Sequence, residues 1–152
     1  MKLSKKTLLV GLLIGQPMVI FAIVGPWEVP AIVALGQVES GERDKVIGKH
    51  GEVSRYQIRE NVWKKYNTHY YPASWTDYHT AAQVAYQHMR WLQEEYTKHT
   101  NKDANSTELY VMYNAGFDYY KKRKFDMSKV SYDIRERAAR FTNLYILYSS
   151  KN

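Results

Sequence analysis

The acidic residue best placed to do chemistry is Glu39, near the end of an apolar stretch that begins at Pro30 and stops at Ser40-Gly41. The C-terminal end of a helix disfavours a carboxylate, and apolar surroundings withdraw the group from water, so both effects raise its pKa. A carboxyl group that stays protonated near neutral pH can act as a general acid. Glu39 is therefore the candidate catalytic residue, and the competing interpretation is a solvated residue just beyond a core helix.

The residues needed for several other kinds of chemistry are missing from the sequence. The 152 residues include no Cys, which excludes a disulfide scaffold, a thiolate zinc site and a Cys nucleophile. The five His residues form no His-Glu-x-x-His pair and no acidic cluster is present, so we expect neither a metal nor another cofactor. Ser40 lies in Val-Glu-Ser-Gly-Glu, which is not the Gly-x-Ser-x-Gly turn of hydrolases.

The hydrophobic pattern predicts the elements that must position Glu39. With 45% hydrophobic and 14% aromatic residues, the chain can form a globular core. Apolar residues recur at three- and four-residue spacing, which predicts a mainly α domain of about five or six helices. The predicted helices span residues 30–40, 57–66, 76–99, 109–115 and 131–148, and residues 41–55 form an irregular loop or a short β region.

Local signals mark where these helices begin and end. Thr76 or Asp77 could cap the long helix, whose apolar stripe contains Ala81, Ala85, His88 or Met89, Leu92 and Tyr96. Asn105 and Glu108 have the spacing of a capping box, and Gly116 stands where a C-terminal cap belongs. Pro72 is expected to break the chain.

The first 25 residues differ from the rest. Lys2, Lys5 and Lys6 precede an uncharged, mainly apolar run of roughly 18 residues, the layout of an export signal, although a retained membrane anchor has nearly the same length. We therefore divide the chain into a signal peptide or anchor, residues 1–25, and a domain, residues 26–152. Without those three Lys the net charge falls from +7 to +4, which weakens any argument for a nucleic-acid partner.

Several short motifs then occur in a definite order. Glu39-Ser40-Gly41 is followed by Gly51 twelve residues after the Glu, by Gln57-Ile58, and later by Tyr113-Asn114-Ala115-Gly116. Together they resemble the lytic transglycosylase domain of soluble lytic transglycosylases, which is related to goose-type lysozyme. The likeness covers about residues 29–148.

The resemblance implies a lysozyme-like fold that cleaves the β-1,4 bond between N-acetylmuramic acid and N-acetylglucosamine in peptidoglycan. It assigns Glu39 as the single general acid and base, with a 1,6-anhydro sugar as the product. It also implies that Ser40 orients Glu39, that Gln57 lines the cleft, and that Tyr113 and Asn114 face the catalytic carboxyl group.

The sequence also departs from the family pattern. Ser54-Arg55-Tyr56 replaces Gly-Leu-Met, so Ser54 must keep a negative φ or tolerate strain, and a more polar cleft floor is expected. Phe117-Asp118 replaces the Pro-Gly that often follows the last motif. These differences leave open a non-catalytic peptidoglycan-binding or assembly protein.

Glu52, next to Gly51, leaves open a hydrolytic reaction. A hydrolytic glycosidase needs a second carboxylate close to the first, either as nucleophile or to activate water. If Glu52 points into the cleft, the chain could be a lysozyme that hydrolyses the same bond. The simpler interpretation is a solvated charge in a loop.

Aromatic and basic residues complete the expectations. Tyr70-Tyr71, Trp75 and Tyr119-Tyr120 could stack on sugar rings, whereas Trp63, Trp91 and Tyr145 are expected in the core. The basic run Lys121-Lys122-Arg123-Lys124 either attracts anionic cell-wall polymers or is a solvated loop between helices.

These features predict where the protein is located and what it binds. We expect export to the periplasm or the medium, with membrane contact only through residues 1–25. The expected partners are peptidoglycan glycan strands and no nucleic acid, and an envelope complex that recruits the protein is a further candidate.

Overall fold

The computed structural model describes residues 29–70 and 72–151, so the predicted signal or anchor segment lies outside the described residues. The described part is mainly helical, as predicted, and none of its helices is long and apolar enough to cross a membrane. Its elements are α1 (Pro30–Ser40), α2 (Glu60–Tyr66), α3 (Pro72–Trp75), α4 (Tyr78–Thr100), α5 (Ser106–Ala115), α6 (Phe117–Lys122), the 3₁₀ helix η2 (Met127–Lys129) and α7 (Tyr132–Ser149).

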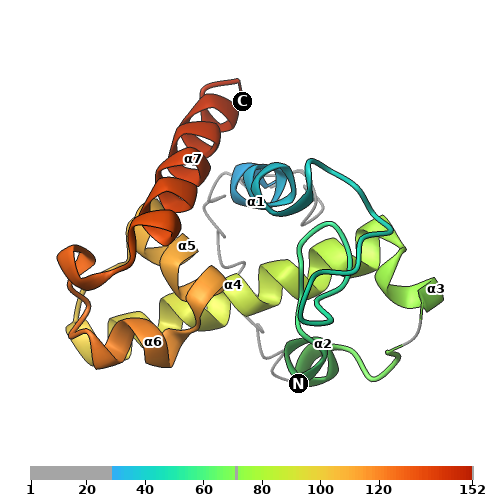
Figure 1. The fold of residues 1–152 in the computed structure, drawn as a ribbon, viewed down its shortest axis with the longest axis horizontal. Coiled ribbons are helices and arrows are strands. Elements are labelled where there is room, and N and C mark those ends of the chain that lie inside the picture. The colour runs from blue at the N-terminus through green and yellow to red at the C-terminus, as the bar shows by residue number, and fades with distance from the viewer. Residues whose placement is uncertain (1–28, 71, 152) are drawn as a thin grey trace, which may run out of the picture.

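The long helix α4 is the element on which most others pack. Figure 1 shows α1 on one side of α4, α5 and α6 towards its C-terminal end, and α3 near its N-terminal end. Helix α2 lies beside the middle of α4, where Tyr66 contacts His88. Helix α1 contacts both α4 and α7, and α5 contacts α4, α6 and α7. This arrangement brings the end of α1, where Glu39 lies, close to elements much later in the chain.

Helix α4 forms where its capping signals and apolar stripe predict it. The Asp77 side chain accepts a hydrogen bond from the Thr80 N–H at 2.8 Å, and Asn101 ends the helix in the left-handed conformation. The predicted stripe is buried, with Met89 rather than His88 at the ambiguous position. His88 is half-buried and lines a cleft instead.

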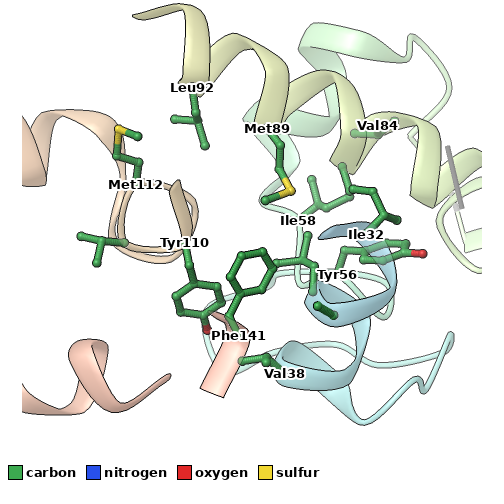
Figure 2. Close-up of a cluster of buried hydrophobic side chains, with 14 of the residues drawn as sticks. Ile32, Val38, Tyr56, Ile58, Val84, Met89, Leu92, Tyr110, Met112 and Phe141 are labelled. Atoms are coloured by element: carbon green, nitrogen blue, oxygen red, sulfur yellow. The ribbon is translucent and has the colours of Figure 1, made fainter. Parts of the chain in front are cut away.

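Helix α1 also agrees with its prediction. Pro30 occupies the first turn, where a missing N–H costs no hydrogen bond. Ile32, Leu35 and Val38 are buried, as Figure 2 shows for Ile32 and Val38. Gly41 closes the helix with a φ of +64°, a conformation that other residues rarely adopt.

Several segments differ from the sequence prediction or decide between its alternatives. The helix predicted from Gln57 begins at Glu60, because Val53 and Ile58 exchange two backbone hydrogen bonds and hold the preceding residues in a tight turn. Of the two alternatives for residues 41–55, the irregular loop is confirmed, since the region forms only isolated bridges at Val53. Pro72 does not simply break the chain, since it begins the short helix α3.

Helix α6 was not predicted, and the aromatic residues are distributed differently from expectation. Trp63 is in the core as predicted, but Trp75 and Tyr120 are also buried there and cannot stack on a sugar. Tyr145, predicted to be buried, is exposed. Tyr71 lies outside the described residues.

The capping box at the start of α5 provides a test of local stability. The Asn105 side chain accepts from the Glu108 N–H, and the Glu108 carboxylate accepts from the Asn105 N–H, both at 3.0 Å. Asn105→Ala is expected to lower the free energy of unfolding by about 1 kcal/mol. Urea denaturation measures this loss, with Lys102→Ala as a control outside the cap. Equal stability of both variants would contradict the prediction.

Candidate active site

The end of α1, the 48–59 loop and helices α2, α4, α5, α6 and α7 enclose a cleft of about 840 Å³. Five of the six residues predicted from the sequence line it: Glu39, Glu52, Gln57, Tyr113 and Asn114. They come from three separate parts of the chain, so the fold assembles them into one site. A cleft of this size suits an extended ligand rather than a single ion.

The Glu39 side chain lies in the wall of this cleft and is only 5% exposed. The Tyr110 hydroxyl donates a hydrogen bond to Glu39 Oε1 at 2.5 Å. On the other oxygen, Arg137 Nη2 lies 3.3 Å from Oε2. These two contacts fix the orientation of the carboxyl group.

Burial raises the pKa of Glu39 above its ordinary value of 4.5. The Tyr110 hydrogen bond, the Arg137 charge and the Asn114 side chain all favour the ionised form, but they do not fully offset the loss of water. The Glu52 charge acts with burial and also raises the pKa. Glu39 therefore holds its proton more strongly than an ordinary carboxyl group does, which suits a general acid.

Tyr110 and Arg137 were not among the site residues predicted from the sequence. Tyr110 precedes Tyr113 by three residues and Asn114 by four, so all three share one face of α5. That spacing was a usable signal for Tyr110. Arg137 lies on α7, 98 residues from Glu39, and nothing local in the sequence connects the two.

Tyr113 joins α5 to the loop on the opposite wall. Its hydroxyl donates to the Tyr56 backbone carbonyl at 2.9 Å. Burial raises the pKa of Tyr113 well above its ordinary value, so the hydroxyl stays protonated. Tyr113 is therefore a structural brace of the cleft as well as a lining residue.

The 48–59 loop carries Glu52 and Gln57 into the cleft. Glu52 Oε2 accepts from the His50 N–H at 3.0 Å, and the Gln57 amide donates to the Ser54 carbonyl at 3.0 Å. Both side chains pack over Gly48, where an added Cβ would collide with them. A larger residue at position 48 would therefore displace the ends of the Glu52 and Gln57 side chains, an effect that the sequence alone did not reveal.

Glu52 differs from Glu39 in its protonation. Burial would raise the pKa of Glu52, but backbone N–H groups at Glu52 and His50 and the nearby charges of His50 and Arg59 hold it below its ordinary value. Of these two carboxyl groups, Glu39 therefore retains its proton more strongly than usual and Glu52 loses it more readily.

Ser40 does not take the place expected for it. Its hydroxyl donates to the Gly36 carbonyl at 3.4 Å and accepts from the Arg43 N–H at 3.1 Å, so it closes the end of α1 outside the cleft. The orienting role expected of Ser40 falls instead to Tyr110 and Arg137.

The altered segment Ser54-Arg55-Tyr56 does not make the cleft floor more polar. Arg55 pairs with Asp44 at 2.6 Å and lies over the Tyr78 ring, while Tyr56 is buried in the core. Neither residue lines the cleft. The expectation of a polar floor at these positions was wrong.

The far end of the cleft is aromatic. His88 and Trp91 of α4 stack with ring centroids 5.6 Å apart, and Trp91 contacts Phe117 edge-on at 6.1 Å. Tyr119 also lines this end, as its sequence position suggested. Trp91, expected in the core, is half-buried and forms part of the cleft wall.

Comparisons with other proteins do not assign a function to this site. No protein-family model, no curated protein and no solved structure matches the chain. Among the described residues, no three His, Asp or Glu side chains are grouped so that they could hold a metal ion. The carboxyl groups and the cleft that they line are therefore the features from which a function can be inferred.

The Tyr110 hydrogen bond offers a direct test of the site. Tyr110→Phe removes a donor that stabilises ionised Glu39, so the pKa of Glu39 is expected to rise further. A ¹³C NMR titration of the Glu39 carboxyl carbon measures this shift, with Tyr145→Phe as a control on α7. A lower pKa in Tyr110→Phe would refute the assigned contact.

Proposed function

We propose that this protein is an exported peptidoglycan lytic transglycosylase with a lysozyme-like domain and Glu39 as its single acid and base. The observation that carries the proposal is the Glu39 carboxyl group, which is buried in the wall of the cleft and has a raised pKa. The basic and apolar residues 2–25 support export.

In the proposed reaction, protonated Glu39 donates its proton to the oxygen between muramyl C1 and the next sugar as the C1–O bond breaks. The resulting carboxylate then accepts the proton of the muramyl 6-hydroxyl, whose oxygen bonds to C1. The product is a 1,6-anhydro ring, no water is consumed, and Glu39 regains its proton. Arg137 and Tyr110 stabilise the intermediate carboxylate.

The backbone conformation supports the motif resemblance. The glycines of the motif, Gly41, Gly51 and Gly116, all have positive φ angles, of +64°, +82° and +96°. Ser54, where the family has Gly, also has a positive φ of +69°. Its hydroxyl accepts the Tyr56 N–H at 3.2 Å, which helps a non-glycine residue to hold this turn.

One observation favours a hydrolytic lysozyme as the second candidate. Glu52 lines the same cleft as Glu39, and its lowered pKa keeps it ionised. An ionised second carboxylate is what hydrolysis through water or a covalent intermediate needs.

Mass spectrometry of the sugars released from purified peptidoglycan tests the proposal, with Glu39→Gln in parallel. A transglycosylase gives products one water lighter than hydrolysis gives, and Glu39→Gln gives none. Products of full hydrolytic mass that disappear in Glu52→Gln would instead identify a lysozyme. Binding without release by the wild-type protein would leave a non-catalytic peptidoglycan-binding protein.

A further inference from the structure

The cleft contains a cation that neither the acid–base chemistry nor the fold requires. Lys65, at the end of α2, is exposed and lines the cleft. Its ammonium group lies 3.7 Å from the centroid of the Trp91 ring, the geometry of a cation–π contact. The ammonium therefore occupies the position from which a sugar would stack on this face of the ring.

The positive charge of Lys65 is also not paired with an acidic side chain. Within residues 29–70 and 72–151, no carboxylate lies within ion-pair distance of its ammonium nitrogen. Glu95 is close enough to sense the Lys65 charge, but its ion pair is with Lys98 at 2.8 Å. Lys121 also lines the cleft and also has no carboxylate partner among the described residues, but its ammonium nitrogen is taken up by His99 Nε2 at 2.9 Å.

A cation held by an aromatic ring inside a ligand cleft, without an acidic partner, is suited to an anionic group of the ligand. Because Trp91 already restricts the ammonium, less side-chain freedom is lost when an anion binds. A glycan composed only of neutral sugars would gain nothing from this charge. Peptidoglycan differs from such glycans by the carboxylates on its muramyl side groups.

We propose that Lys65 binds a carboxylate of the muramyl side group, either that of the lactyl group or one in the stem peptide. This inference rests on the proposed function, since it assumes a muramyl ligand. It gives the cleft a selectivity for charged peptidoglycan over uncharged glycan, and Trp91 becomes a positioning residue for Lys65 rather than a platform for sugar stacking.

Three soluble preparations of glycan strands test the proposal and separate the two sources of carboxylate. Stem-bearing strands carry peptide carboxylates, amidase-stripped strands carry only lactyl carboxylates, and stem-bearing strands with all carboxylates chemically converted to amides carry none. Calorimetry with the Glu39→Gln full chain measures binding without turnover. KM and kcat of the active protein are measured on the same strands.

We expect the amidated strands to bind about three- to tenfold more weakly than at least one charged preparation. A preference that persists on stripped strands identifies the lactyl carboxylate, and one confined to stem-bearing strands identifies the peptide. Lys65→Met should abolish the preference for charged strands, and this loss should appear in KM. Lys65→Arg should largely retain the preference. Lys64→Met is the matched control, because the neighbouring Lys64 is exposed and pairs with Glu60.

Equal binding of all three preparations, binding of none, or a preference that survives Lys65→Met would overturn the proposal. Failure of the proposed function has a different result, since the wild-type protein would then cleave no preparation. In that case a charge preference in binding that depends on Lys65 would still support an anion subsite in a binding protein.

Discussion

Glu39→Gln is expected to lower the rate of glycan release from peptidoglycan by about 10²- to 10⁴-fold, the usual contribution of a general acid or base. Gln can occupy the same volume but can neither protonate a leaving oxygen nor accept the proton of the 6-hydroxyl. The rate is measured as soluble sugar released per unit time. Glu42→Gln is the matched control, because Glu42 is an exposed acid just beyond α1 and outside the cleft.

The stability of the same variant separates loss of chemistry from loss of fold. Because the native pKa of Glu39 is raised above 4.5, the carboxyl group favours folding below that value, and this contribution is lost as the pH rises through the native pKa. Gln does not titrate, so Glu39→Gln should gain stability relative to the wild type as pH rises. Thermal unfolding at several pH values measures this. A variant that loses both activity and stability at neutral pH would contradict the assigned role.

Phe141→Ala is expected to cost about 3–5 kcal/mol of unfolding free energy, the usual loss for a buried aromatic side chain. Phe141 is 1% exposed and stacks on Tyr110 with ring centroids 5.2 Å apart. Figure 2 shows the two side chains next to each other in the core. The cavity would also loosen Tyr110, and through it the hydrogen bond to Glu39.

Denaturant unfolding measures this loss, and Tyr145→Ala is the matched control. Tyr145 lies one turn along α7 and stacks on Phe141 with ring centroids 6.5 Å apart, but it is 37% exposed. Its truncation is expected to cost less than about 1 kcal/mol. If both truncations cost the same, the core does not depend on Phe141 as the structure indicates.

The helices with strong local signals could be predicted from the sequence. Pro30 and Gly41 bound α1, Asp77 caps α4, and Asn105 with Glu108 opens α5, because each signal satisfies backbone groups within a few residues of itself. The start of α2 was misplaced because the turn before it is stabilised by the pairing of Val53 with Ile58.

The candidate site was predictable to a similar extent. Position at a helix end singled out Glu39, the family resemblance added Gln57, Tyr113 and Asn114, and all four line one cleft. The contacts of Ser40 could not be predicted, because adjacency in sequence does not show which way a side chain points at the end of a helix.

The sequence by itself determined a mainly α-helical chain and an acidic residue at the end of an apolar helix. Only the tertiary structure decided which side chains contact that residue and raise or lower its pKa. Tyr110 and Arg137 lie 71 and 98 residues from Glu39, and they reach it because α5 and α7 pack together and α1 packs on α7. Helical periodicity fixes which face of each helix is apolar, but the neighbour that covers this face depends on how the helices pack. The burial that raises the pKa of Glu39 arises from that packing.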